Sequence, residues 1–408
     1  MDYYLVLLLI LPFVWAFIRI VASNNLSSQT LPPGPRPFPI IGNILELGKL
    51  PHQEIAKLSE TYGPLMTLKL GSITTIVISS PTLAKEALQK NDQAFSSRTI
   101  PNMAHVFDHH KISMAWIPTN AKWKNLRKAS ATQIFATKPL DATQALRQTK
   151  YDSNLSQEFR DLACGVTEEA GRPNIADYFP ALRLIDPQGV RKRTRIYFSK
   201  VFGIFDGIIN QRLQLRASKG SKESNDVLDS LLSLTEEDNS EINLLDIKHL
   251  LLDLFIAGID TTSSTVEWAM AELLHNPEKM TKARDELEEV LGKGGHFQES
   301  YISKFNYLRA IVKETLRLHP SVPFLFPQQD IDYKGQDFEL IPFGAGRRIC
   351  PGLPLANRMV HLMLASLVHY FAWKLPNEMR PEDMDMAEMF GFTLHRAVPL
   401  LAIPIKSL

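Results

Sequence analysis

Residues 343–352 read Phe343-Gly344-Ala345-Gly346-Arg347-Arg348-Ile349-Cys350-Pro351-Gly352, which places one cysteine in a glycine-rich, doubly basic loop directly before a helix-forming run. Glycines let backbone N–H groups point at the sulfur, and arginines and a helix N-terminus favour the negative charge of a thiolate. We therefore expect a lowered pKa for Cys350 and a thiolate that binds a metal at neutral pH. The alternative interpretation is a small buried apolar side chain in a tight turn.

The composition predicts a globular chain with one large domain or two merged ones. The chain has 408 residues, of which 45% are hydrophobic and 22% charged, so it can bury a large core. Lysine and arginine number 45 against 44 aspartates and glutamates, and this balance argues against a nucleic acid as partner. The two cysteines, Cys164 and Cys350, exclude a disulfide scaffold, and we expect Cys164 to be inert core.

The N-terminus carries an uncharged apolar run from residue 3 to 18, which reaches residue 22 if Arg19 snorkels. This length suffices for one membrane crossing, and Asp2 before it with Arg19 after it predicts a cytosolic location for the rest. A cleaved signal peptide is the alternative, although Asp2 replaces the usual positive charge. The expected organisation is a membrane anchor (1–22), a polar spacer with a proline-rich hinge (23–39), and one catalytic domain (40–408).

The longest predicted helix spans residues 244–275 and ends at Asn276-Pro277. It would be about 45 Å long, and its dense apolar positions place it in the core. Within it lies Ala257-Gly258-Ile259-Asp260-Thr261-Thr262, a poor helix sequence by propensity. The small residues leave room for a flat cofactor or dioxygen, and Thr261 can bond back to a helix carbonyl or to a water. A polar cluster at a helix break is the alternative.

Strands are predicted only for short segments. Residues 67–70 and 74–78 alternate as a hairpin around Gly71-Ser72, and most of the remaining chain has helical patterns. The expected fold class is mainly α with a small β lobe.

The loop pattern Phe-x-x-Gly-x-Arg-x-Cys-x-Gly resembles the haem-binding loop of the cytochromes P450, and the run at residues 257–262 resembles their oxygen-activation segment. The resemblance implies haem b as cofactor, Cys350 as the axial iron ligand, and Thr261 and Asp260 as catalytic residues that manage protons. It also implies haem contacts from Ala257, Gly258, Phe343, Gly346 and Gly352.

Further motifs carry the same resemblance. Trp123 and Arg127 match the family's Trp-x-x-x-Arg helix, which implies that both side chains and Arg348 reach haem propionates. The nearby basic residues would form a docking patch for an acidic electron donor: Lys122, Lys124, Lys128 and Arg347. A helix predicted at 303–319 contains Glu314 and Arg317, whose similar pair in the family is a structural ion pair buried behind the haem loop and completed by a later arginine.

Within the superfamily the chain is similar to plant microsomal monooxygenases that hydroxylate geraniol and related monoterpenols. The similarity lies at residues 97–101, 108–111, 116–118, 380–386 and 391–394. It implies electrons from a membrane-bound NADPH-dependent reductase, insertion of one oxygen atom into a small hydrophobic, terpenoid-like substrate, and a location at the endoplasmic reticulum membrane.

The sequence departs from this pattern in two places. Several tens of family residues are missing after Lys150, and more are missing near Gln328, so that only 33 positions separate Arg317 from Cys350. The second gap removes the arginine that would complete the buried pair, at an expected cost of about 3–5 kcal/mol. An inactive, haem-free chain is therefore an alternative. A haem-thiolate isomerase or dehydratase is another, but such enzymes commonly lack the pair formed by Asp260 and Thr261.

Overall fold

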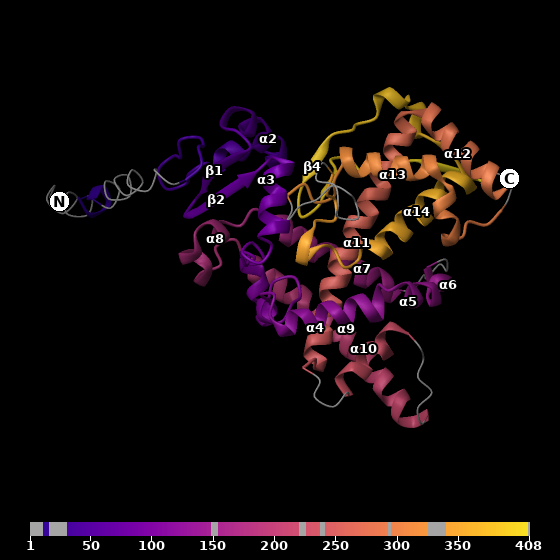
Figure 1. Ribbon diagram of the computed structural model, residues 1–408, viewed down its shortest axis with the longest axis horizontal. Helices are drawn as coiled ribbons and strands as arrows, with labels where there is room; N and C mark the ends of the chain where they lie inside the picture. Colours follow the sequence, from indigo (N-terminus) through magenta and orange to yellow (C-terminus); the bar gives the residue numbers. More distant parts are fainter. Residues whose placement is uncertain are drawn as a thin grey trace. The chain divides into compact units, whose positions relative to one another are not determined.

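The structure is a computed structural model that describes residues 11–15, 31–147, 154–219, 226–236, 241–292, 295–324 and 340–406. The chain divides into two compact units, residues 1–84 with 174–188 and residues 85–173 with 189–408 (Figure 1). Of the expected anchor at residues 1–22, the structure describes residues 11–15, which are helical and exposed. The rest of the anchor lies outside the described residues. Among the described helices, none has the length and apolar character needed to span a membrane.

The first unit contains the predicted hairpin. Strands β1 (Leu65–Leu70) and β2 (Ile73–Ile78) pair antiparallel, and Gly71 turns between them with φ of +59°. The proline-rich segment lies against β1, because Thr67 donates from its backbone N–H to the Pro33 carbonyl (2.9 Å) and from its hydroxyl to the Pro32 carbonyl (2.8 Å). A Cβ on Gly34 would lie 2.0 Å from the Thr67 carbonyl oxygen, so only glycine fits there.

Short helices make up the rest of the first unit. They are η1 (Ile44–Leu47), α2 (Pro51–Tyr62), α3 (Pro81–Lys85, whose last residue falls in the second unit), α8 (Ile175–Tyr178) and η5 (Pro180–Leu184).

The second unit is mainly helical and holds the predicted site segments. Its helices are η2 (Glu86–Lys90), η3 (Asn102–Lys111), α4 (Ala121–Ala129), η4 (Ser130–Ile134), α5 (Thr137–Ala142), α6 (Gln144–Arg147), α7 (Asn154–Gly171), α9 (Val190–Lys219), α10 (Val227–Glu236), α11 (Leu244–His275), α12 (Pro277–Leu291), η6 (Glu299–Lys304), α13 (Asn306–Leu318), η7 (Gly346–Arg348), α14 (Leu353–Tyr370), η8 (Pro376–Glu378) and η9 (Pro381–Asp383). Two antiparallel pairs complete it, β3 (Phe371–Lys374) with β6 (Ile403–Lys406) and β4 (Glu388–Phe390) with β5 (Leu394–Arg396). The predicted fold class is confirmed.

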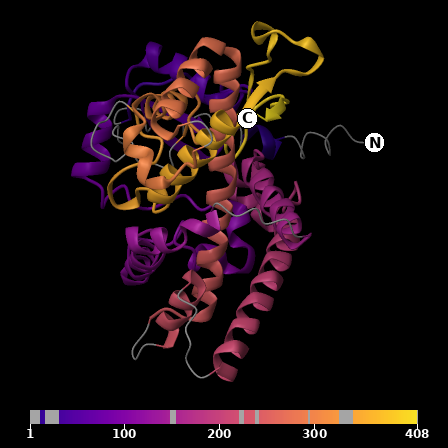
Figure 2. The same ribbon diagram turned by 90° about the vertical axis from the view of Figure 1, so that its right-hand side faces the viewer.

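Helix α11 has the predicted bounds. Asn243 accepts a hydrogen bond from the Asp246 backbone N–H (3.0 Å), and the Asp246 carboxylate accepts one from the Asn243 N–H (3.1 Å), which is a capping box. Pro277 begins the next helix. Figure 2 shows α11 as the long salmon helix of this unit, with α9 beside it in the lower part. The apolar pattern and the stop signal at Asn276-Pro277 were therefore sufficient to predict this helix, and the structure adds the cap at Asn243.

The core of the second unit consists of two apolar clusters at the two ends of α11. Ile247, Leu250 and Leu252 belong to one cluster, and Val266 and Ala269 belong to the other. Between them Phe255, Ala257 and Gly258 are exposed. The prediction that this helix passes through the core holds for both of its ends, and the exposed middle is the segment with the unusual small and polar residues.

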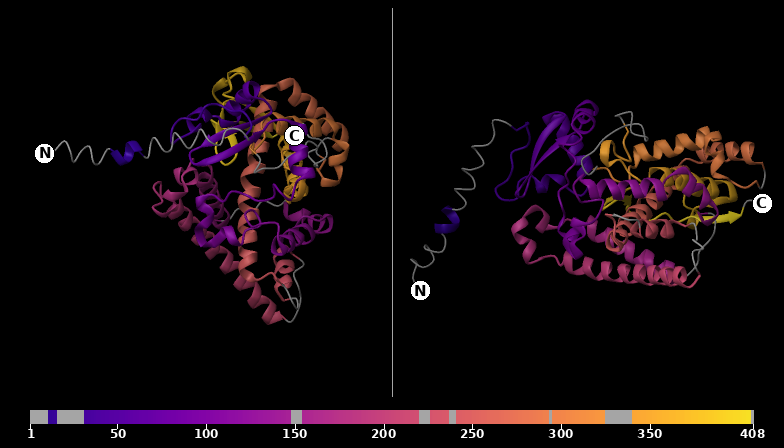
Figure 3. Two further views of the ribbon diagram at one scale, coloured as in Figure 1. Left: turned by 60° about the vertical axis from the view of Figure 1, so that its left-hand side comes forward. Right: turned by 60° about the horizontal axis from the view of Figure 1, so that its bottom comes forward.

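Helix α7 contacts both α9 and α11 (Figure 3). Its residue Cys164 is exposed, so the prediction of a core cysteine is wrong. Leu162 and Val166 are buried, and a residue two positions away lies about 200° around a helix, which places Cys164 on the opposite face.

Candidate active site

The Cys350 loop is closed by backbone hydrogen bonds. The Cys350 N–H donates to the Phe343 carbonyl (2.9 Å), and the N–H groups of Gly352 and Leu353 at the start of α14 donate to the Cys350 sulfur. Gly346 has φ of +61°, and a Cβ there would lie 2.6 Å from the Leu88 carbonyl oxygen. The loop conformation thus requires glycine at position 346 and directs two N–H groups at the thiol.

The expected low pKa of Cys350 is wrong for the protein chain alone. Burial raises the pKa of this thiol, and the hydrogen bonds from Gly352 and Leu353 and the charge of Arg127 lower it by less. Burial in the protein chain alone therefore favours the neutral thiol, and a bound metal ion favours the thiolate.

Three arginines gather beside this loop. Arg348 is 7% exposed and donates to the carbonyls of Ser96 and Ile117, both at 2.6 Å. Arg127 donates to the Ile349 carbonyl, and Arg98 donates to the Ala115 carbonyl at 2.8 Å. These bonds join residues 96–117, α4 and the Cys350 loop into one structure.

The indole of Trp123 lies between two of these guanidinium groups. Its ring centroid is 5.9 Å from the Arg127 Cζ and 5.4 Å from the Arg348 Cζ, and its N–H donates to the Met114 carbonyl at 3.2 Å. The structure thus brings together the three residues that the sequence predicted, and it adds Arg98. In the sequence Arg98 stands out only as part of the family signature at residues 97–101, because its charged neighbours Arg348 and Asp253 lie far along the chain.

The arginine cluster carries excess positive charge. Burial and the neighbouring charge of Arg348 lower the pKa of Arg98 to about 10, and burial followed by the charge of Arg127 lowers the pKa of Arg348. Asp253 acts in the opposite sense on Arg98. A cluster in which cations disfavour one another binds an anionic group well.

The unusual segment of α11 is continuous helix, so the alternative of a helix break is wrong. The Thr261 hydroxyl donates to the Ala257 carbonyl at 2.7 Å, and the Thr261 carbonyl accepts from Thr265 (2.8 Å) and Ser321 (3.2 Å). No atom lies within 4 Å of the position a Cβ would take on Gly258. Open space therefore adjoins the small residues, as predicted.

Asp260 contacts two residues from the C-terminal part of the chain, one of them by a hydrogen bond. Its Oδ2 accepts from the Thr393 hydroxyl at 2.6 Å, and the His395 Nε2 lies 2.7 Å from that hydroxyl and 3.6 Å from Asp260 Oδ2. His395 could not be predicted as a site residue, because nothing in the sequence around residue 395 indicates a contact with residue 260.

Comparison with known proteins identifies the family. The family model for cytochrome P450 matches residues 32–163, 146–333 and 327–399, which together cover most of the chain. The chain belongs to the cytochrome P450 family. It is 44% identical to cytochrome P450 76T24 of Catharanthus roseus over all of both chains, and 44% identical to geraniol 8-hydroxylase of Catharanthus roseus over 99% of each. It is 40% identical to drimenol monooxygenase of Persicaria hydropiper, over 94% of this chain and 93% of that protein.

The match also confirms the predicted internal gaps. The family model matches in three pieces, and the pieces meet at residues 146–163 and 327–333. The alignment with cytochrome P450 76T24 has 498 positions against 408 residues here, so at least 90 of its positions have no counterpart in this P450.

As a cytochrome P450 the protein is a haem-thiolate monooxygenase, and its residues fit haem b. The cysteine loop has two N–H groups directed at the sulfur, the arginine cluster suits the two propionates, and α11 has open space at Gly258. Among the described residues, no group of three or more His, Cys, Asp or Glu side chains is arranged to hold a metal ion.

The ion pair of Glu314 and Arg317 forms, but it is not buried. Two hydrogen bonds of 2.7 and 2.6 Å join the side chains, each of which is 55% exposed. The expected cost of a buried, incomplete pair is therefore wrong, because both charges remain in water. Gln328 and the second gap lie outside the described residues.

The predicted docking patch is only partly available. Lys122 pairs with the buried Asp246 at 2.6 Å, and Arg347 pairs with Asp92 at 2.7 Å. Lys124 and Lys128 are exposed.

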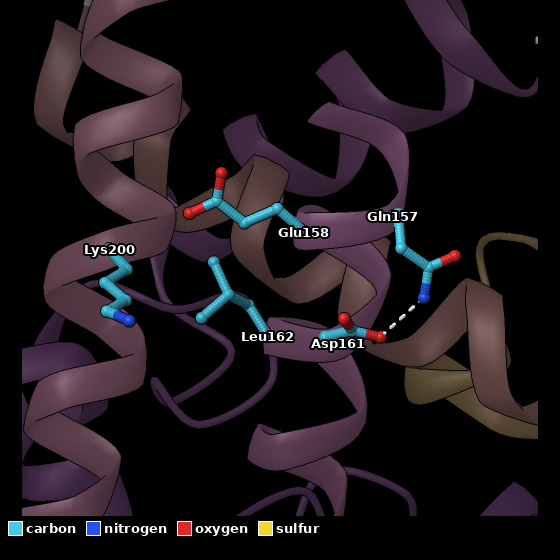
Figure 4. A pocket seen from close by; sticks show the side chains of 5 residues that line it. All are labelled: Gln157, Glu158, Asp161, Leu162 and Lys200. Atoms are coloured by element: carbon cyan, nitrogen blue, oxygen red, sulfur yellow. Dashed lines mark hydrogen bonds between the residues drawn. The ribbon is translucent and has the colours of Figure 1, made fainter. Parts of the chain in front are cut away.

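Two cavities adjoin α7 in this P450. One of about 460 Å³ is lined by Gln157, Glu158, Asp161, Leu162 and Lys200, and Figure 4 shows that four of these side chains come from one helix. The other, of about 420 Å³, is apolar and includes Phe159, Phe205 and Phe255. Phe255 lies two residues before Ala257 and thus about 200° around α11, so this cavity opens away from the Ala257 face. Residues 100–116 and 392–393 line neither cavity.

Proposed function

We propose that this cytochrome P450 hydroxylates a small hydrophobic, terpenoid-like substrate, with dioxygen and with electrons from an NADPH-dependent reductase. Two relatives at 44% and 40% identity are named for geraniol and drimenol, and the family signatures at residues 97–101 and 391–394 support the same substrate class. The observation that carries the proposal is the closed Cys350 loop beside the buried arginine cluster.

Each site residue has a role in this proposal. Cys350 would ligate the iron, and Arg127, Arg348 and Arg98 would hold the propionates by charge-assisted hydrogen bonds. Trp123 would join them if its N–H exchanged the Met114 carbonyl for a propionate oxygen. When bound, the haem supplies the activation of dioxygen. Ala257, Gly258, Phe343, Gly346 and Gly352 leave space for it and shape its loop.

We assign proton transfer to two residues of α11. Thr261 and Asp260 lie within about 60° of Ala257 around the helix and so share its face. The Thr261 hydroxyl donates to its own helix carbonyl and remains an acceptor, whereas Asp260 exchanges protons through its partner Thr393. Residues 100–116, 250–262, 322–326 and 392–393 enclose an apolar substrate.

We also propose a membrane location and a reductase-binding surface for the enzyme. Residues 1–22 anchor it in the endoplasmic reticulum membrane, with residues 40–408 facing the cytosol. Lys124 and Lys128 form the exposed part of the surface that meets the reductase.

The test is the reduced carbon-monoxide spectrum and haem content of the purified full chain. We expect a red-shifted band that Cys350→Ser abolishes and Cys164→Ser leaves unchanged, because Cys164 is the exposed cysteine on α7. Survival of the band in the Cys350→Ser variant would refute the ligand assignment.

A second candidate is a haem-free chain, which the absence of at least 90 family positions favours. Purified wild-type chain that takes up no haem from added haemin would establish it. A haem-thiolate isomerase or dehydratase, disfavoured by the Asp260 and Thr261 pair, would convert a fatty-acid hydroperoxide without reductase.

A further inference from the structure

We propose that His395 is the point at which protons enter from solvent, and that it passes them through the Thr393 hydroxyl to Asp260. The proposal rests on the proton-handling role proposed for Asp260. It names a route on this chain that connects α11 to the surface through β5.

The hydrogen-bond chain has a defined direction. An ionised carboxylate only accepts, so the single hydrogen of the Thr393 hydroxyl points to Asp260 Oδ2 at 2.6 Å. The contact of 2.7 Å between Thr393 Oγ1 and His395 Nε2 must then be donated by the imidazole. Both bonds are short enough for proton transfer.

The exposures of the three side chains match a path from outside to inside. The His395 side chain is 31% exposed, Asp260 is 16% exposed, and Thr393 is fully buried between them. Water therefore reaches the imidazole and not the hydroxyl, so the hydroxyl is bonded to these two side chains and not to bulk solvent.

Leu394, which lies between Thr393 and His395 in the chain, fixes the positions of both residues. The Leu394 carbonyl accepts from Ser264 (2.9 Å) and Trp268 (3.3 Å) of α11, and the Leu394 N–H donates to the Ser321 carbonyl (2.8 Å). Thr393 and His395 are consequently fixed against α11 and do not depend on a mobile loop.

The net result of the transfer is that one proton moves from His395 to Asp260. Imidazolium His395 gives its Nε2 proton to Thr393 Oγ1 while Thr393 gives its hydroxyl proton to Asp260 Oδ2. The products are neutral imidazole and neutral carboxylic acid. Water reprotonates His395, and rotation of the hydroxyl restores the starting arrangement.

Other titratable groups adjoin this chain. Cys164 on α7 lies near Asp260, and burial, followed by the charges of Asp260 and Asp161, raises the pKa of the Cys164 thiol. On the sheet side His395 pairs with Met389 of β4, while Glu388 is opposite Arg396. Asp260 is the carboxylate that faces the imidazole, with its Oδ2 3.6 Å from the His395 Nε2.

The first experiment needs no turnover. Full-length chain labelled at the histidine nitrogens is examined by NMR, with the His395 signals assigned by their loss in His395→Gln. The His395 Nε2 should carry a hydrogen that is bonded to the Thr393 hydroxyl, so its nitrogen and N–H signals should move in Thr393→Val. His395 signals that are identical in Thr393→Val and in the wild type would overturn the proposal, whether or not the chain binds haem.

The second experiment uses the haem-loaded enzyme with reductase. His395→Gln keeps a hydrogen-bonding side chain but cannot be protonated, so kcat and product formed per NADPH should fall about tenfold with unchanged KM. The loss should disappear when Asp260→Asn is already present. His275→Gln, at the end of α11 with its ring bonded to Pro381, is the matched control and should retain the wild-type pH profile.

Full activity and an unaltered pH profile in His395→Gln would overturn the relay. A wild-type chain with no carbon-monoxide band would instead refute the proposed function, and the NMR experiment on Thr393→Val would then test the hydrogen-bond chain by itself.

Discussion

The Ser113 hydroxyl lies 2.7 and 2.8 Å from the two carboxylate oxygens of Asp253 and thereby ties residues 113–117 to α11. The carbonyls that accept from Trp123, Arg98 and Arg348 belong to the same short segment. The position of the arginine cluster thus depends on a hydroxyl that contacts none of the arginines.

Ser113→Ala should reduce the free energy of unfolding by about 1.5–3 kcal/mol, because a buried carboxylate loses a charge-assisted hydrogen bond. Urea unfolding measures this change. Ser263→Ala is the control, since the Ser263 hydroxyl is exposed and donates to the Ile259 carbonyl of its own helix, and it should stay within about 0.5 kcal/mol. Equal effects of both variants would contradict the assigned role of Ser113.

Arg348→Lys should speed the loss of haem to apomyoglobin and lower stability by about 2 kcal/mol. A lysine cannot replace the forked bonds to the Ser96 and Ile117 carbonyls. The neighbouring Arg347→Lys alters a partly exposed pair with Asp92 and should change stability by less than about 1 kcal/mol. Retention of haem by Arg348→Lys at the wild-type rate would exclude Arg348 from the site.

Gly346→Ala should lower both stability, by about 1–3 kcal/mol, and haem content. The positive φ and the close Leu88 carbonyl leave no position for a methyl group. Gly203→Ala in α9 meets no atom within 4 Å and should stabilise the chain by about 0.5–1 kcal/mol. Thermal unfolding of the two variants in opposite directions is the expected result.

A double-mutant cycle on Glu314 and Arg317 should give a coupling energy below about 1 kcal/mol, because both side chains are largely exposed. The cycle compares Glu314→Ala, Arg317→Ala and the double variant by urea unfolding. A coupling of about 3 kcal/mol or more would mean that the pair is buried in solution.

The stability of the chain should fall between pH 6.5 and pH 4 in a way that depends on His249. Burial, followed by the charge of His109, lowers the pKa of His249 to about 4. The unfolded chain then binds more protons across this interval, so the stabilisation is present above pH 6.5 and is lost as the pH falls through 4. His249→Gln should flatten this part of the urea-unfolding pH profile, whereas His275→Gln should leave its slope unchanged.

Local signals were enough for the main elements. The cap at Asn243 and the stop at Asn276-Pro277 set α11, and Gly71 set the hairpin, because each signal lies within a few residues of the structure it controls. The loop around Cys350 and the Ala257–Thr262 run likewise indicated the family that the comparisons confirm.

The burial of titratable groups and their contacts with residues far along the chain could not be predicted from such local signals. The raised pKa of Cys350, the association of Arg98 with Arg348, and the link from Asp260 to His395 each join residues far apart in the chain or depend on how much water remains around a group. The amino-acid order alone established the helices, the cysteine loop and the family. Only the tertiary structure decided which charges lose their water and which meet a partner, since desolvation and Coulomb energy depend on spatial neighbours and not on sequence neighbours.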